Sequence, residues 1–188
     1  MKLSSHTVRR VGATAAAAVS AALLIPAVAL AAPGRAAAPA AAPGCTASQV
    51  DAWIATPGGA AAGSVFYQLE ISNVSSRACT LFGYPGVSGV RDSTQLGSAA
   101  GRTASHPAAL VTLGTGGTAH AELQVTDTAN FPPSVCAQVT ASGLRVFAPN
   151  DFLSHVVPFS FPACSKAGPV YLHVSRMIAG TGIPGFSH

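Results

Sequence analysis

Four cysteines constrain this chain more than any other feature, because all of them follow a segment typical of an export signal: Cys45, Cys79, Cys136 and Cys164. Disulfides form and persist in oxidising compartments, and a secreted chain with an even number of cysteines is expected to pair them. The cysteines therefore predict a domain that is stapled by disulfides and works outside the cytosol.

The export signal has three recognisable parts. Lys2, Arg9 and Arg10 precede an uncharged, alanine-rich apolar stretch over residues 11–30, and Ala29-Leu30-Ala31 supplies the small residues that a signal peptidase requires. We predict a signal peptide over residues 1–31 and no membrane insertion after its cleavage. A retained membrane anchor is the alternative, which alanine and Pro26 disfavour because they support insertion and helix formation poorly.

The next segment, residues 32–44, is almost entirely Ala, Pro and Gly, and it predicts a disordered spacer. The whole chain has ten Lys and Arg against six Asp and Glu, but three of the ten lie in the signal. The exported part thus keeps seven basic and six acidic residues and is nearly neutral. A balance of this kind argues against nucleic acid as a partner, because such binding depends on many neutralised phosphates.

Residues 45–175 have the length of one domain, and residues 176–188 are predicted to be an irregular C-terminal tail. Apolar and polar residues alternate over residues 65–71, 119–126 and 170–174, which is typical of half-buried strands. Further strands are expected at 50–54, 79–82, 109–113 and 144–148, with glycine- and proline-containing turns between them. We predict an all-β fold, an antiparallel, Ig-like β-sandwich, with a small β-barrel as the alternative.

Four cysteines permit three pairings, and the spacing alone does not choose between them. Sequential pairing is the simplest, with Cys45 joined to Cys79 and Cys136 to Cys164, over 34 and 28 positions. A structural zinc site is disfavoured because the chain has no C-x-x-C motif.

The segment from Leu69 to Val87, LEISNVSSRACTLFGYPGV, resembles the signature of an actinobacterial exported family known only as domain of unknown function 4232. The resemblance continues through Val111-Thr112-Leu113, residues 119–125, Cys136 and residues 142–146, and so covers about residues 45–174. It implies a small secreted or envelope-attached β domain and no particular activity.

The signature also has a direct physical interpretation. Asn73 and Ser75 are suited to close a turn, while Pro85 and the flanking glycines favour a tight corner. Tyr84 is then expected to pack on the core with its hydroxyl bonded to the backbone. An exposed recognition loop is the alternative to this structural corner. Asn73-Val74-Ser75 also matches a glycosylation sequon, which we interpret as a turn.

No catalytic constellation is recognisable. Ser88 lies in a glycine setting but lacks the pattern of a nucleophile elbow, and Glu70 and Glu122 fall on polar strand faces where solvated carboxylates are ordinary. We predict that the protein is not an enzyme and has no cofactor and no metal site. The alternatives are an unrecognised envelope enzyme or a metal-handling protein, in which His120, His173 and Glu122 would converge from neighbouring strands and His155 would join them.

Trp53 is expected to be a buried anchor of the core, with an exposed sugar-stacking residue as the alternative. Together these features predict a secreted or envelope-associated, monomeric β domain that binds an envelope protein or glycan. Since no residue pattern identifies the ligand, this function rests on export, a rigid scaffold and the lack of catalytic motifs.

Overall fold

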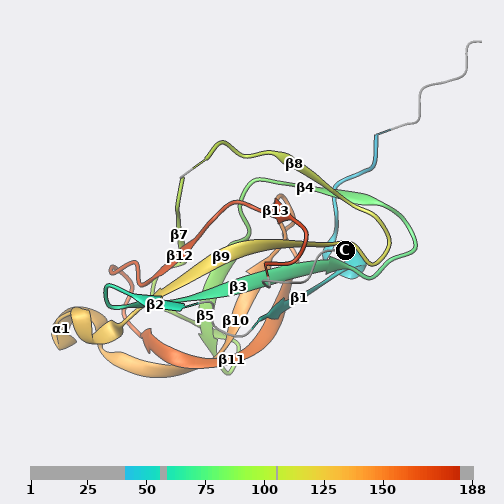
Figure 1. Cartoon of the computed structure of the whole chain (residues 1–188). Helices are drawn as coiled ribbons and strands as arrows, with labels where there is room; N and C mark the ends of the chain where they lie inside the picture. Colours follow the sequence, from blue (N-terminus) through green and yellow to red (C-terminus); the bar gives the residue numbers. More distant parts are fainter. Residues whose placement is uncertain (1–40, 56–58, 105, 183–188) are drawn as a thin grey trace, which may run out of the picture. The chain divides into compact units, whose positions relative to one another are not determined.

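A computed structural model describes residues 41–55, 59–104 and 106–182, all within one structural unit, Ala40–His188 (Figure 1). The predicted signal peptide and residues 32–40 of the predicted spacer lie outside the described residues.

The larger sheet has the strand order β1-β3-β9-β12-β7 (Figure 1). In addition, β2 pairs with β3 and β13 pairs with β9. Its strands are β1 (Val50–Ile54), β2 (Gly59–Ala61), β3 (Ser64–Asn73), β7 (Gly101–Arg102), β9 (Thr118–Thr126), β12 (Leu172–Val174) and β13 (Ile178–Ala179). Strands β3 and β9 form its centre and pair without a register shift from Ser64↔Thr126 to Ser72↔Thr118. All pairs in this sheet are antiparallel except β12 with β7.

The smaller sheet has the order β11-β10-β5-β6, and β4 and β8 form a separate two-stranded ribbon. These strands are β4 (Cys79–Phe82), β5 (Gly86–Arg91), β6 (Thr94–Leu96), β8 (Leu110–Leu113), β10 (Gln138–Phe147) and β11 (Ser154–Cys164). The helical segments are short: η1 (Ala47–Gln49), η2 (Thr128–Asn130) and α1 (Pro133–Cys136).

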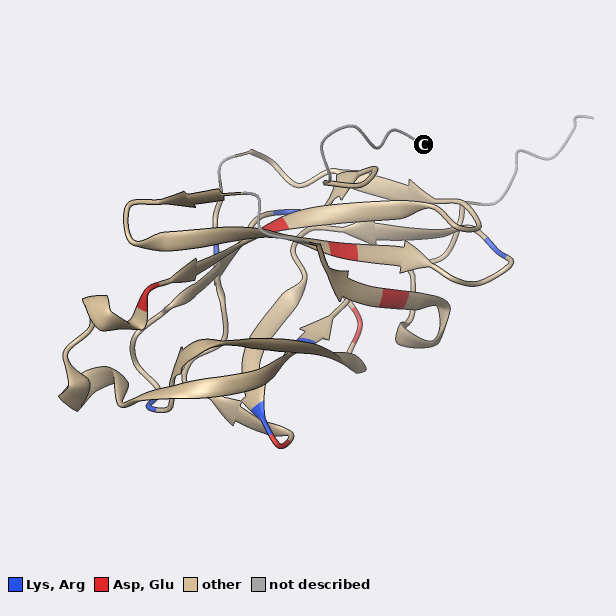
Figure 2. Cartoon of the chain, turned by 60° about the horizontal axis from the view of Figure 1, so that its bottom comes forward, with Lys and Arg blue, Asp and Glu red and all other residues tan. Residues whose placement is uncertain are grey.

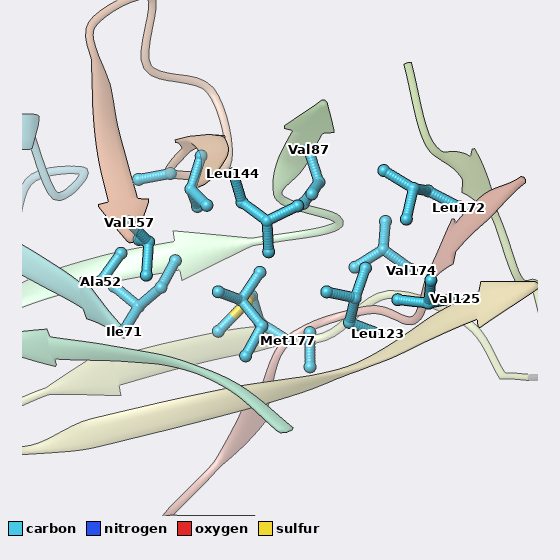
Figure 3. Packing of buried hydrophobic residues seen from close by; sticks show 14 of the residues in the cluster. Ala52, Ile71, Val87, Leu123, Val125, Leu144, Val157, Leu172, Val174 and Met177 are labelled. Atoms are coloured by element: carbon cyan, nitrogen blue, oxygen red, sulfur yellow. The ribbon is translucent and has the colours of Figure 1, made fainter. Parts of the chain in front are cut away.

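The core lies between the two sheets. Figure 3 shows Ile71 and Leu123 of the larger sheet facing Leu144 and Val157 of the smaller sheet, with Met177 among them. Strands that alternate in burial, such as β9, in which Ala119, Ala121, Leu123 and Val125 are buried, turn one face toward this layer. The predicted β-sandwich is confirmed, and the sheets do not close into a barrel.

Both disulfides have the sequential pairing, Cys45–Cys79 and Cys136–Cys164. The first joins the chain before β1 to the start of β4. The second joins α1 to the end of β11. All four cysteines are buried, so the two crosslinks form part of the core.

Two predicted boundaries need correction. The predicted spacer ended at residue 44, but Pro43 accepts a hydrogen bond from the Thr80 amide and Gly44 forms a bridge to Thr80. The predicted irregular tail began at residue 176, yet Met177 is fully buried and β13 pairs with β9. At both ends, backbone pairing with a distant strand orders residues that have no periodic pattern of their own.

Tyr171 fills the middle of the sandwich, although alternation placed it on the polar face of its strand. Strand β12 begins only at Leu172, so the alternation does not extend to Tyr171, which is fully buried. Its hydroxyl donates to the Leu96 carbonyl at 3.0 Å, and burial raises the pKa of Tyr171 to about 12. A Cβ at Gly89 would lie 2.6 Å from this hydroxyl oxygen, which explains a glycine inside β5.

Replacing Tyr171 with Phe is expected to lower the free energy of unfolding by about 1–2 kcal/mol, because the buried Leu96 carbonyl loses its donor while the ring packing remains. Urea denaturation of both proteins measures the change. An unchanged midpoint would show that this carbonyl does not depend on Tyr171.

Candidate functional site

A cleft of about 550 Å³ opens between the β2–β3 hairpin and the end of β11. Its wall is mainly apolar and carries a few polar groups, the usual composition of a small ligand site. The lining residues are Ala60, Ala61, Ala62, Gly63, Ser64, Val65, Tyr67, Val125, Thr126, Asp127, Phe161 and Pro162.

A line of four aromatic rings runs from the cleft into the core. Tyr67 of β3 meets Phe159 of β11 edge to face, with ring centroids 4.8 Å apart and planes at 81°. Phe159 lies 5.1 Å from Phe161, which lies 6.5 Å from Tyr171. The two aromatic rings that line the cleft, Tyr67 and Phe161, are therefore both packed against Phe159.

The hairpin that forms the opposite wall is held in place at its tip. Ala62 and Gly63 both have positive φ, 48° and 72°, as a two-residue hairpin turn requires. Gly63 accepts hydrogen bonds from the Asp127 amide and from the side chain of Asn130. A Cβ at Gly63 would lie 2.7 Å from that side chain, so glycine is needed there for space as well as for its φ angle.

Several polar groups of the cleft are engaged in hydrogen bonds within the domain. The Ser64 hydroxyl donates to the Thr126 hydroxyl at 3.4 Å and accepts from the side-chain amide of Gln124 at 2.9 Å. A carboxylate oxygen of Asp127 accepts from the backbone amide of Ala129 and so caps η2. The Tyr67 hydroxyl has no hydrogen-bond partner within the described residues and is available to a ligand. Among the lining residues there is no histidine, lysine or cysteine to act as a base or nucleophile beside Ser64.

The structure separates the histidines of the metal hypothesis. His120 and His173 share the outer face of the larger sheet, but His173 pairs with Gln124, four positions along β9 from His120. His155 lies in the smaller sheet, where its Nε2 is 2.9 Å from the Ala47 carbonyl oxygen. No three His, Cys, Asp or Glu residues gather as metal ligands in the part of the chain that the structure describes.

Other residues singled out in the sequence lie within strands or turns of the fold and outside the lining of the cleft. Ser88 is buried inside β5, away from any turn. Asn73 is fully buried and its side-chain nitrogen donates to backbone carbonyls, so it is not exposed as a glycosylation acceptor would be.

The Tyr84 corner is attached to the domain through the Met177 amide, which donates to the Gly83 carbonyl. Tyr84 is half-buried with the Arg102 guanidinium 5.5 Å from its ring, whereas the predicted bond from its hydroxyl to the backbone is not formed among the described residues.

The predictions of a buried Trp53 and of a solvent-exposed Glu70 are both wrong. Trp53 is half-buried on the outer face of the larger sheet, where its indole nitrogen donates to the Ser72 hydroxyl at 3.2 Å. Glu70 was expected to be solvated but is fully buried beneath residues 180–182, and its Oε1 accepts from the Gly182 amide at 2.8 Å. Burial raises the pKa of the Glu70 carboxyl, against smaller lowering effects of the Gly182 amide and of His120.

The strands of the larger sheet carry three acidic residues and Arg102, whereas the charged residues on strands of the smaller sheet are arginines. Figure 2 shows acidic segments on neighbouring strands of the larger sheet, where Asp51, Glu70 and Glu122 lie, whereas Arg91 and Arg145 belong to the smaller sheet. Both arginines also bond to backbone carbonyls, of Thr140 and Ser93 respectively, so part of their donor capacity is used within the fold.

Sandwich, crosslinks and cleft together define a disulfide-linked β-sandwich domain with a small apolar cleft at one end. Residues 45–178 match the sequence profile of the family described as domain of unknown function DUF4232, and the chain belongs to that family. No curated protein matches the chain. No helix within the described residues is long and apolar enough to cross a membrane.

Proposed function

We propose that the chain is exported, loses residues 1–31 and works outside the cytosol as a non-enzymatic binding domain. The single observation that carries the binding role is the preformed cleft beside Tyr67 and Phe161. Two buried disulfides are compatible with an oxidising compartment. An actinobacterial source remains an expectation from the family resemblance.

The lining favours an envelope protein over a glycan as the partner. A sugar ring presents several hydroxyl groups that each need a polar partner on binding. The cleft offers few such groups, and Ser64, Thr126 and Asp127 already bond within the domain. An aliphatic or aromatic side chain fits better, since it would bury apolar surface against Val65, Val125 and Phe161 while the free Tyr67 hydroxyl bonds its backbone.

The test uses the exported chain, residues 32–188, immobilised and exposed to an envelope extract. Ala61 lines the cleft and is exposed, so Ala61→Trp is expected to fill the cleft and weaken capture of a saturable partner at least tenfold. Ala109→Trp is the matched control, because Ala109 is exposed and does not line the cleft.

Circular dichroism should show both variants folded like the parent chain. Equal capture by the parent and by both variants would exclude the cleft as the binding site. Repeated failure of the parent chain to capture any saturable partner would argue against the binding role itself.

A further inference from the structure

The end of the described chain crosses the outer face of the larger sheet. We call residues 178–182 the C-terminal strap. After β13, the Gly180 amide donates to the Thr118 carbonyl at 2.9 Å, and the Gly180 carbonyl lies 2.8 Å from Nδ1 of His120, which therefore donates to it. The Gly182 amide then reaches Oε1 of Glu70 on the next strand, β3. The strap thus runs from β9 onto β3 over side chains that would otherwise face solvent.

Glycine allows the strap to lie flat on these side chains. Gly180 has a φ of 84°, and a Cβ at Gly182 would lie 2.5 Å from Oε1 of Gln68. Gly182 is therefore in direct contact with both Gln68 and Glu70, which project from the same face of β3 two positions apart. The main chain of the strap thus lies directly against side chains of β3.

Two buried oxygen atoms beneath the strap lack a donor. Oε2 of Glu70 and Oε1 of Gln68 are both buried and have no hydrogen-bond partner among the described residues. A buried acceptor without a donor costs about 1–3 kcal/mol, and an ionised one costs more. Protonation of Glu70 removes the negative charge of its carboxylate and turns one carboxyl oxygen into a hydrogen-bond donor. An ionised Glu70 is instead a buried charge whose single hydrogen bond comes from the Gly182 amide.

The charged groups near Glu70 come from two neighbouring strands. On β9, His120 is the direct cross-strand partner of Glu70, and Glu122 is the partner of Gln68. On β1, the direct partner is Trp53, with Asp51 two positions away. The strap itself carries no charged side chain. A positive His120 opposes protonation of Glu70 and the other carboxylates favour it, but burial is the largest effect.

We propose that the C-terminal strap is a proton-controlled latch, which is closed over a neutral Glu70 and released when Glu70 ionises. Release would uncover Glu70 and His120 and would free the edge of β9 that β13 occupies. This latch lies on the outer face of the larger sheet, apart from the residues that line the cleft, and does not rest on the proposed binding function.

The direction of the pH effect follows from linkage. In the closed form the pKa of Glu70 is raised by burial, while in the open form the exposed carboxyl has an ordinary pKa. The closed form therefore binds the proton more tightly. Closure is fully favoured below the ordinary pKa of a glutamate and weakens as pH rises through the raised pKa, by about tenfold for each unit of difference.

The test measures the strap directly in the exported chain, residues 32–188. Hydrogen exchange of the Gly180 and Gly182 amides, followed by NMR between about pH 4 and 8 and corrected for intrinsic exchange rates, should show protection that falls as pH rises. Glu70→Gln keeps the shape and remains neutral, so its protection should not change with pH. Emission of Trp53, the one tryptophan of the chain and the neighbour of Glu70, should follow the same transition and lose it in Glu70→Gln.

His120→Asn is the second variant, because His120 also contacts the strap and acts on the charge of Glu70, and an asparagine amide retains a donor for the Gly180 carbonyl. The latch predicts that this variant keeps a transition, shifted to higher pH by loss of the positive charge. A transition that persists in Glu70→Gln and disappears in His120→Asn would overturn the proposal, as would protection in the parent chain that is constant with pH.

Discussion

Replacing Cys136 and Cys164 together with alanine is expected to lower the free energy of unfolding by about 3–4 kcal/mol. The disulfide closes a loop of 28 residues, and in the chain-entropy model such a crosslink stabilises mainly by restricting the unfolded chain. The loop contains β10 and almost all of β11, which form the most extensive antiparallel pair of the smaller sheet. Loss of the crosslink therefore affects the half of the sandwich that contributes Phe161 and Pro162 to the cleft.

Chemical denaturation of the double variant and of the oxidised parent measures this difference. Reduction of the parent should reproduce the direction of the effect without any substitution. If the variant and the parent unfold at the same denaturant concentration, β10–β11 pairing alone holds this region and the crosslink contributes little.

Replacing Asn73 with alanine is expected to cost about 3 kcal/mol, at the upper end of ordinary single substitutions. The Asn73 side-chain nitrogen lies 2.8–3.1 Å from the carbonyl oxygens of Arg77, Leu113 and Gly114, and its oxygen accepts from the amide and hydroxyl of Ser75. One fully buried amide thus joins the end of β3 to the turn before β4 and to the turn between β8 and β9. Alanine leaves the buried Leu113 carbonyl and the part-buried carbonyls of Arg77 and Gly114 without this donor.

Ser75→Ala is the matched control, because it removes one hydroxyl from the same turn while leaving the Asn73 nitrogen in place. It should cost about 1 kcal/mol or less. Thermal unfolding of the three proteins under identical conditions gives the comparison. Equal losses for both variants would mean that Asn73 acts only within its local turn and does not join the two distant segments.

Strands with clean alternation could be predicted from the sequence because one of their faces meets the core and the other meets solvent or polar groups. The predicted strands at 50–54 and 79–82 coincide with β1 and β4, and 119–126 falls within β9. The turn-forming role of Asn73 and Ser75 was also predictable, since these side chains bond their own local backbone.

Strands β5 and β11 were not predicted, for reasons that lie outside their local sequences. Gly86 and Gly89 in β5 resemble a turn, but Gly89 is required where Tyr171 crosses the core. Pro158 and Pro162 lie inside β11, and prolines generally argue against a strand, yet β11 is at the edge of its sheet, where a proline need not donate to a neighbouring strand. In both cases a residue far along the chain, or the position of the strand in the sheet, overrides the local pattern.

The candidate site was least predictable because its parts come together only in the folded chain. The cleft combines a hairpin at residues 60–65 with Phe161, and neither segment carries a binding motif. Glu70 is buried where Gly182, 112 positions later, donates a hydrogen bond to it. The alternation at 65–71 correctly placed Glu70 on the outer face of the sheet but contains no information about what covers that face.

The most direct test of an exported, disulfide-linked β-sandwich is mass spectrometry of the native protein recovered from outside the cell, intact and after proteolysis without reduction. We expect a chain that begins after residue 31, with a mass lower by two hydrogens for each of the two disulfides, and crosslinked peptides that join Cys45 to Cys79 and Cys136 to Cys164. A full-length chain found only inside the cell, four free thiols, or peptides that join the cysteines in another pairing would contradict it.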